Sequence, residues 1–308
     1  MGIEISIIIV NYNTIKLVSD CINSICKLTS FVDYEIIVVD NNSEDILELK
    51  NLDDKVHVLQ LEKNIGFGRA NNAGAKIANG KILFFLNPDT LLLNDAISIL
   101  YHSICSNDKM GVCGGNLYDS NNNPIHSYDD ISLSFSYLFK LMTIPPKMFR
   151  NINRQHNFTN KQKSVGYITG ADIMIRKSIF DKIGGFSKDI FMYYEDIDLC
   201  YRVKKMGYKI ISVPTAKIVH LEGQSAIGDT DSEKAYRKNM MSLKSQIIFL
   251  RNNHSKLYSK LLIRCSILSL RLRKFLIKQI GHDTSFVISS IDNYKRLYKM
   301  YHEKESIN

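Results

Sequence analysis

The first ninety residues alternate between short apolar runs rich in β-branched residues and longer segments with helical spacing. The runs at 5–10, 34–39 and 81–86 are apolar almost throughout, which is typical of strands buried on both faces. Helical patterns at 17–28 and 68–78 stand between them. A strand–helix–strand rhythm with short connections favours a parallel, doubly wound sheet.

Polar residues follow three of these predicted strands. They are Asn11 and Asn13 after the run at 5–10, Asp40 and Asn42 after the run at 34–39, and Asn87 and Asp89 after the run at 81–86. One such cluster is explained well enough by helix capping. Three clusters at the same edge of one sheet favour a ligand site, because ligands bind beyond the carboxyl ends of parallel strands.

Three carboxylates follow directly after the aromatic run at 191–194. They belong to Glu195, Asp196 and Asp198. Acidic residues stabilise the first turn of a helix, and Asp198 and Arg202 have the spacing of a helical ion pair. Carboxylates beside bulky aromatic residues are also candidates for general-base or metal chemistry. Both interpretations stay open at this point.

The basic charge of the chain lies entirely in its C-terminal quarter. Residues 1–230 hold 24 Lys and Arg against 25 Asp and Glu, a net charge of −1, whereas residues 231–308 hold 16 against 6, a net charge of +10. We therefore predict a catalytic domain over 1–230 and a basic helical segment over 231–308. A nucleic-acid-binding body is not expected. The basic segment suits an anionic membrane surface or a partner subunit.

Six cysteines show neither a Cys-x-x-Cys pair nor metal-finger spacing, so we expect free, buried thiols in a reducing compartment. The chain starts without a basic leader, and its apolar runs are broken by charges before the roughly 18 residues that a membrane span needs. We expect a cytoplasmic protein, peripheral at the inner face of the cytoplasmic membrane. An oligomer is possible.

A set of short motifs stands in one order between residues 4 and 225. They are Ile-Ile-Val-Asn-Tyr-Asn at 8–13, Val-Val-Asp-Asn-Asn-Ser at 38–43, the segment 64–72, Leu-Asn-Pro-Asp at 86–89, Thr-Gly-Ala-Asp at 169–172, Gly-Gly-Phe at 184–186, the acidic cluster from 193 to 202, and His220. In this order the chain resembles family-2 glycosyltransferases in their rhamnosyltransferase-like branch. The resemblance implies an α/β protein with the GT-A (nucleotide-diphospho-sugar transferase) fold, in which helices flank a mostly parallel sheet, followed here by the basic helical appendage.

The resemblance also implies an inverting transfer of a sugar from a nucleoside diphosphate donor. The donor most consistent with the branch is dTDP-L-rhamnose, with UDP-hexoses still open. The acceptor would be a glycan or a lipid-linked glycan in surface polysaccharide (O-antigen or capsule) synthesis. An alternative is a non-catalytic GT-A-like scaffold subunit. A sugar nucleotidyltransferase is disfavoured, because no Gly-rich basic loop follows the first strand.

By the same resemblance, Asp196 is the expected base, with Glu195 as its hydrogen-bonding neighbour and the alternate base. The family's metal-binding Asp-x-Asp element reads Asn87-Pro88-Asp89 here, so its first acid is absent. Asp89 and His220 would then hold a divalent cation, Mg²⁺ or Mn²⁺, which accepts further oxygens from phosphate and water.

The predicted nucleotide-sugar pocket is drawn from every strand-end cluster. Its members are Asn11, Asn13, Asp40, Asn42, Asn64, Gly66, Phe67, Asn71, Asn87, Asp89, Gly170, Ala171 and Asp172. Within it, Asp40 would read the pyrimidine ring or the ribose. The segment around Gly66 is not a dinucleotide fingerprint, because Asn71 stands where the third glycine would be. We expect Ala70 and Gly74 to permit close helix packing, and 118–165 to form a lid or acceptor-binding excursion.

Overall fold

The computed structural model describes residues 2–44, 54–130, 155–221, 231–279 and 285–303. These residues form two compact units. The first unit holds the described residues up to 191 and from 195 to 221, and the second holds 192–194 and those from 231 onward. The domain boundary predicted at residue 230 lies outside the described residues, so it stays a prediction.

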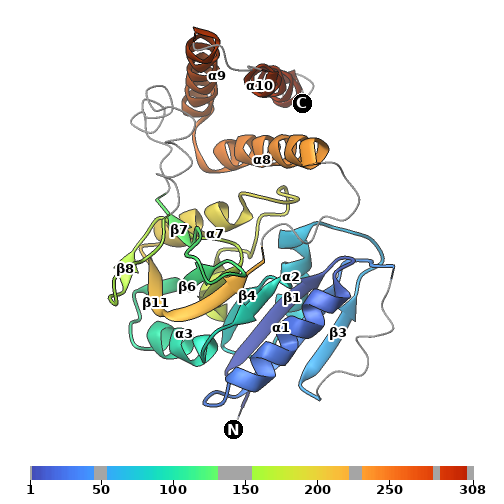
Figure 1. The fold of residues 1–308 in the computed structure, drawn as a ribbon, viewed down its shortest axis with the longest axis vertical. Helices are drawn as coiled ribbons and strands as arrows, with labels where there is room; N and C mark the ends of the chain where they lie inside the picture. The colour runs from blue at the N-terminus through green and yellow to red at the C-terminus, as the bar shows by residue number, and fades with distance from the viewer. Residues whose placement is uncertain (1, 45–53, 131–154, 222–230, 280–284, 304–308) are drawn as a thin grey trace. The chain divides into compact units, whose positions relative to one another are not determined.

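The first unit is built around one mixed sheet (Figure 1). Its parallel half has the order β3-β2-β1-β4. The bounds are Ile5–Asn11 for β1, Tyr34–Asp40 for β2, Val56–Gln60 for β3 and Ile82–Leu86 for β4. Every residue of β1, β2 and β4 is buried. This confirms the expectation that their apolar runs form strands covered on both faces.

The other half of the sheet continues as β10-β6-β11-β5, with β8 paired to β11. The bounds are Asp172–Arg176 for β10, Met110–Tyr118 for β6, Lys209–His220 for β11, Thr90–Leu92 for β5 and Lys163–Ser164 for β8. A separate pair joins β7, Tyr128–Asp129, to β9, Tyr167–Ile168. Strand β10 runs antiparallel to both β4 and β6, so β4 and β6 point the same way.

This topology brings separate parts of the chain to one edge of the sheet. Strands β1, β2, β4, β6 and β11 all end there, and β10 begins there. His220 is the last residue of β11 and pairs with Thr90. Strand β11 reaches it by continuing past a register shift between Ser212 and Lys217.

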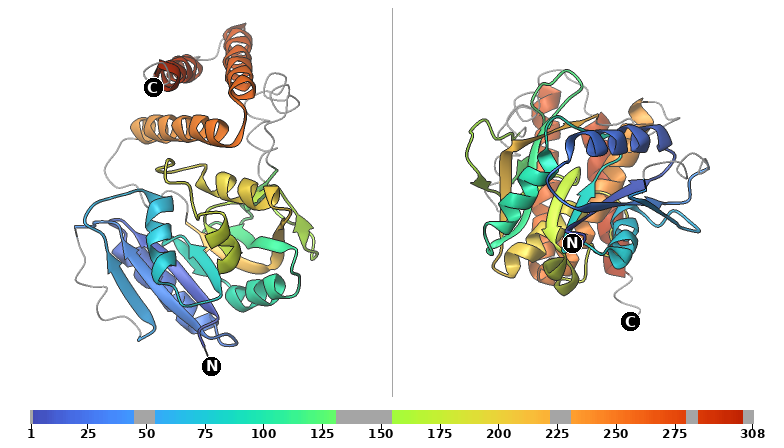
Figure 2. Two further views of the ribbon diagram at one scale, coloured as in Figure 1. Left: turned by 180° about the vertical axis from the view of Figure 1, so that it is seen from behind. Right: turned by 90° about the horizontal axis from the view of Figure 1, so that it is seen from below.

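Helices cover both faces of the sheet, as Figure 2 shows from below for α1 and α2. Alternate strand residues point to opposite faces, so Ile7 and Ile9 join one core and Ile8 and Val10 the other. Helices α1, Ile15–Leu28, and α3, Ala96–Cys105, pack on the first core. Helices α2, Phe67–Ile77, α6, Lys177–Lys182, and α7, Glu195–Lys205, pack on the second. The expected α/β architecture, a sheet flanked by helices on both faces, is confirmed.

Helix α2 lies very close to the sheet. A Cβ added at Gly74 would stand 2.7 Å from Ile8 Cγ2 and 2.9 Å from Val39 Cγ2, closer than carbon atoms approach without displacement. Ala70 is fully buried on the same face of the helix. The predicted packing role of Ala70 and Gly74 is therefore confirmed.

The second unit contains three helices in its described part. They are α8, Asp231–Asn253, α9, Lys256–Gln279, and α10, Ser285–Glu303. Side chains from α9 and α10 form a small apolar core that includes Ile277, Val287 and Ile291. None of the helices described here combines the length and the apolar character that a membrane crossing requires.

The structure differs from the expected burial of the cysteines, and it describes only part of the predicted excursion over 118–165. None of the six cysteines, all of which lie among the described residues, forms a disulfide, as predicted, but only Cys21, Cys113 and Cys200 are buried, and Cys105 is exposed. The excursion predicted over 118–165 is described only at its two ends, where β7 and β8 lie. Its central part, 131–154, is outside the described residues.

Candidate functional site

The ends of β1 and β2 are tied together by one buried amide. Asn11 Nδ2 donates to Asp40 Oδ1 at 2.8 Å and to Ser43 Oγ at 3.0 Å. Its Oδ1 accepts from the backbone N–H and the hydroxyl of Thr14. Asn11 and Asp40 are fully buried, so in this structure Asn11 fixes the loops around the predicted nucleotide pocket.

The turns above these two residues are exposed and conformationally special. Asn13 and Asn42 both have positive φ angles, 56° and 68°, which asparagine tolerates better than most residues. Asn13 Oδ1 accepts from the backbone N–H of Glu44, and its own N–H donates to Ser43 Oγ. The two strand-end loops therefore brace one another at the rim.

A second asparagine network forms the turn before α2. Asn41 Nδ2 donates to Asn64 Oδ1, which also accepts from the backbone N–H of Gly66. Gly66 has φ 87°, and a Cβ there would stand 2.5 Å from the carbonyl oxygen of Phe191. That carbonyl accepts from the N–H of Phe67 at 3.0 Å. Asn41 was not among the predicted pocket residues, although it lies inside the quoted 38–43 motif.

Asn71 points back into its own helix. Its side chain is 1% exposed, and Nδ2 donates to the carbonyl oxygen of Phe67. Asn71 and Phe67 thus lie at the start of α2, beside the loop that carries Asn64. Their role in sugar-nucleotide binding stays a prediction.

Asn87, Asp89 and His220 meet at the centre of the sheet edge. His220 Nε2 lies 3.3 Å from Asp89 Oδ1 and 3.4 Å from Asn87 Nδ2. Asp89 is buried, and the His220 side chain is 15% exposed. Residues 133 positions apart in the chain therefore form one cluster because β11 ends beside the turn that follows β4.

This cluster has a donor set that fits a divalent cation held jointly with ligand oxygens. Among the described residues, the buried Asn87 Oδ1 and His220 Nδ1 have no hydrogen-bond partner. Within those same residues, no three His, Cys, Asp or Glu side chains gather closely enough to hold a metal by themselves. Asp89 and His220 would supply the strongest protein ligands, and phosphate and water oxygens would supply the rest.

Glu195 and Asp196 stand at the first turn of α7, where the helix dipole favours negative charge. Asp196 is half-buried, and its Oδ2 accepts from the backbone N–H of Gly170 at 3.0 Å. Its Oδ1 accepts from the N–H of Ile197 at 2.8 Å. Glu195 is 7% exposed, and its Oε2 has no hydrogen-bond partner among the described residues.

Burial raises the pKa of both carboxyl groups. The pKa of Asp196 rises to about 6, with the bonds from Ile197 and Gly170 acting against the rise. The pKa of Glu195 rises to about 8 through burial and the charge of Asp196 beside it. The pair therefore separates into a group that ionises near neutrality and one that holds its proton longer, an arrangement that suits a general base with a protonated neighbour.

The dipeptide Gly170-Ala171 links the carboxylate pair to the cluster of Asn87, Asp89 and His220. Gly170 N–H donates to Asp196, and the carbonyl oxygen of the next residue, Ala171, accepts from the N–H of Asn87 at 2.9 Å. Consecutive Cα atoms are about 3.8 Å apart. The carboxylate pair and the cluster of Asn87, Asp89 and His220 therefore lie next to each other at the same edge.

Asp172 follows this dipeptide but faces the interior. It is fully buried, and its Oδ2 accepts from the N–H of Gly115. Burial raises the pKa of Asp172 well above its ordinary value of 3.8. In this structure Asp172 supports the strand beneath the site, and contact with a ligand stays a prediction.

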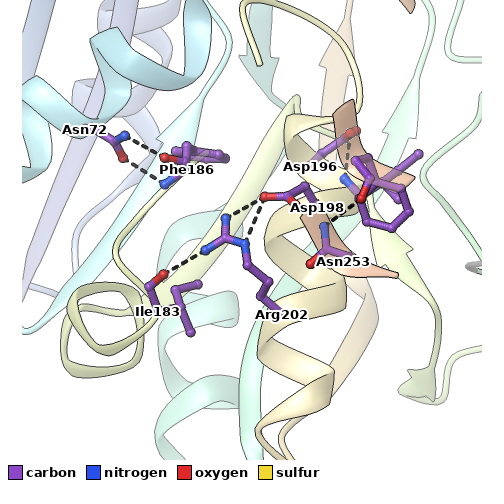
Figure 3. Close-up of polar contacts among 9 residues, drawn as sticks. Asn72, Ile183, Phe186, Asp196, Asp198, Arg202 and Asn253 are labelled. Atoms are coloured by element: carbon purple, nitrogen blue, oxygen red, sulfur yellow. Dashed lines mark hydrogen bonds and ion pairs between the residues drawn. The ribbon is translucent and has the colours of Figure 1, made fainter. Parts of the chain in front are cut away.

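Two side-chain clamps hold the segment that leads to α7 (Figure 3). Asn72 donates to the carbonyl oxygen of Phe186 and accepts from its N–H, both at 2.8 Å. The predicted ion pair is confirmed: Arg202 donates twice to Asp198 Oδ2, at 2.7 and 2.9 Å, and also to the carbonyl oxygen of Ile183.

Three curated relatives show what this chain is similar to. The low-salt glycan biosynthesis hexosyltransferase Agl10 of Haloferax volcanii is 26% identical over 238 residues, 76% of this chain and 71% of the relative. The dTDP-rhamnosyl transferase RfbF of Shigella flexneri is 25% identical over 264 residues, 82% of each chain. The N-acetylglucosaminyl-diphospho-decaprenol L-rhamnosyltransferase of Mycobacterium tuberculosis is 35% identical over 102 residues, but the match spans only 32% of its length.

A solved structure supports the fold independently of sequence. GalNAc-T7, crystallised with UDP, GalNAc and Mn²⁺, superposes with a TM-score of 0.58 at 15% identity over 81% of this chain and 48% of that one. Residues 6–184, more than half of the chain, match the family described as glycosyl transferase family 2. The chain therefore belongs to glycosyl transferase family 2 and is a glycosyltransferase.

Proposed function

We propose that this protein is an inverting glycosyltransferase that moves L-rhamnose from dTDP-L-rhamnose onto a glycan or lipid-linked acceptor of a surface polysaccharide. The observation that carries the chemistry is the pair Glu195–Asp196 beside the cluster of Asn87, Asp89 and His220. The donor is supported by relatives such as the dTDP-rhamnosyl transferase RfbF, whose match spans 82% of both chains.

In the proposed reaction, Asp196 accepts the proton of the acceptor hydroxyl as that oxygen attacks the anomeric carbon of the donor sugar. The bond from this carbon to the diphosphate oxygen breaks, and its electron pair leaves with the nucleoside diphosphate. Attack from the face opposite the leaving group inverts the anomeric configuration. A raised pKa suits Asp196 to this role, because a base whose pKa lies near the working pH is partly ionised and still binds a proton well.

Glu195 keeps its proton to higher pH, so it presents a neutral neighbour that does not repel the negative donor. Asp89 and His220, with Asn87 beside them, would hold Mg²⁺ or Mn²⁺, which neutralises charge on the departing diphosphate when bound. Asp40 and the asparagine turns around Asn11 and Asn64 would hold the nucleoside at the other end of the edge.

The alternative, a non-catalytic scaffold subunit, is favoured only by the missing first acid at Asn87. It gives no reason for two adjacent carboxyl groups whose pKa values are both raised, that of Asp196 to about 6 and that of Glu195 to about 8, beside that position.

A donor screen tests the proposal. The purified protein is incubated with Mn²⁺, a lipid-linked acceptor and, in turn, dTDP-L-rhamnose, UDP-glucose and UDP-galactose, and nucleotide release is followed. We expect acceptor-dependent release of dTDP to exceed release of UDP by at least about tenfold, a difference of about 1.4 kcal/mol in transition-state binding. Faster turnover of a UDP-hexose would contradict the donor, and no turnover with any donor would favour the scaffold.

A further inference from the structure

Helix α9 exposes a row of apolar side chains. Leu257, Leu261, Leu268, Leu272 and Phe275 are between 42% and 79% exposed. At about 100° per residue, these five positions fall within an arc of about 60° on one side of the helix. A contiguous exposed apolar row of this kind marks a site of interaction.

The exposed row is not the side by which α9 packs within its own unit. Leu262, Ile263 and Ile277 are buried and lie on the other side of the helix. Ile277 packs with Val287 and Ile291 of α10. The helix thus has one apolar side that builds the unit and a second apolar side that is presented to solvent.

A row of basic side chains runs directly beside the exposed leucines. Lys260, Arg264, Arg271 and Lys278 fall within an adjacent arc of about 40°. The last three of these are exposed. The 24 residues of α9 include no Asp or Glu. One edge of the helix therefore carries exposed apolar side chains next to basic side chains that no acidic residue of α9 neutralises.

We propose that this edge of α9 docks on an anionic lipid bilayer, with the leucine row entering the head-group region and the basic row contacting lipid phosphates. A helix lying in the interface requires an apolar strip flanked by Lys and Arg, and both rows are present here. The inference goes beyond sugar transfer and does not depend on it, because it rests on α9 alone.

The charge pattern selects this occupant over a second copy of the chain. Two α9 edges brought together offer no Asp or Glu of α9 to pair with either basic row, and an antiparallel pair about a two-fold axis would place the two basic rows side by side, where like charges disfavour association. An anionic surface removes that repulsion. The leucine and basic rows then act together instead of opposing each other.

Vesicle sedimentation tests the proposal on the full-length protein. Phosphatidylglycerol vesicles are compared with phosphatidylcholine vesicles in 0.05 M and 0.5 M NaCl. We expect binding to the anionic vesicles that weakens with salt. The charge variant R264E/R271E/K278E and the apolar variant L268S/F275S should each bind these vesicles at least about tenfold more weakly.

Matched controls change the same chemistry elsewhere. K76E/K182E/K209E reverses three exposed lysines of the first unit, and I77S/L93S removes two exposed apolar side chains there. Both controls should bind like the wild type, and circular dichroism should show all variants folded. Equal binding by the α9 variants, equal binding to neutral vesicles, or no binding would overturn the proposal. A dimer in solution that L268S/F275S converts to a monomer would also overturn it, in favour of a second copy.

Discussion

The two adjacent carboxyl groups at the start of α7 differ in what surrounds them. Asp196 is half-buried and accepts two backbone hydrogen bonds, whereas Glu195 is buried with Oε2 facing no donor among the described residues. Hydrogen bonds to the ionised form lower a carboxyl pKa and burial raises it. Position within a single helical turn therefore decides which acid is ionised first.

Glu195 should destabilise the fold as the pH rises. Its pKa is about 8 in the native protein against an ordinary 4.5, so between these values the native state holds a proton that the unfolded state has lost. The free energy of unfolding then falls with rising pH, by up to about 1.4 kcal/mol per unit. Glu195→Gln removes this loss, so its stability relative to wild type should grow from pH 5 to pH 8.

Urea denaturation at pH 5, 6.5 and 8 measures this difference. Asp20→Asn, which changes an exposed carboxylate on α1, serves as the control and should differ from wild type by the same small amount at each pH. A constant difference between Glu195→Gln and wild type across the range would show that Glu195 ionises normally.

If Asn87, Asp89 and His220 surround a divalent cation, substitutions there should change the metal concentration that activity requires. Asp89→Asn and His220→Gln should each raise the Mn²⁺ concentration for half-maximal activity by about 10- to 100-fold, because each removes a ligand. Asn87→Asp should lower that concentration, since it adds an anionic oxygen where a buried amide oxygen now has no partner among the described residues. Metal titrations of turnover measure all three, with Glu62→Gln, an exposed acid, as the control. Unchanged metal dependence in Asp89→Asn and His220→Gln would contradict the ligand assignment.

At the scale of elements, the segment from β10 to α7 is held by side chains that form hydrogen bonds with its backbone. Asn72 of α2 satisfies both the N–H and the carbonyl oxygen of Phe186, and Arg202 of α7 reaches the carbonyl oxygen of Ile183. Phe186 itself packs its ring against Phe85 and Phe180. The start of α7, and with it Asp196, inherits its position from these anchors.

Removing the Asn72 clamp should cost stability and activity together. Asn72→Ala loses two hydrogen bonds worth about 1 kcal/mol each, so we expect about 2 kcal/mol less stability. We also expect a lower kcat, because the segment leading to Asp196 loses an anchor. Lys76→Ala changes an exposed position of the same helix. It should change neither the free energy of unfolding nor the activation free energy of turnover by more than about 0.5 kcal/mol. Denaturation and turnover measurements on both variants check this, and a stable Asn72→Ala would contradict the clamp.

Across the elements, the strands with continuous apolar runs were predictable, because burial on both faces leaves an unbroken pattern. Strands β1, β2 and β4 were expected within one residue of their bounds. The far end of β11 was not, because Pro214, Thr215 and Lys217 interrupt the pattern where the register shifts. Its last residue, His220, entered the predicted site only through the family resemblance, since pairing with β5 depends on contacts far apart in sequence.

At the scale of the whole molecule, the uneven charge predicted two regions, and it could not say which side chains face solvent. The apolar positions of α9 repeat with helical spacing on more than one side, so the sequence alone does not separate its packing side from its exposed side. Packing against α10 makes that separation by burying Ile277 and leaving Leu268 and Phe275 exposed. The asparagine networks could not be predicted from the sequence either. Asn41 and Asn64 become hydrogen-bond partners only when the strand order brings their loops together.

The proposed sugar transfer depends most on Asp196 as the proton acceptor. Turnover of Asp196→Asn is measured beside its donor affinity, the first by nucleotide release and the second by calorimetry, with the rate of the wild type followed from pH 5 to pH 8. We predict a loss of at least about 100-fold in kcat with donor affinity unchanged within about threefold, and a wild-type rate that rises through a pKa of about 6. Normal turnover in Asp196→Asn would contradict the assignment.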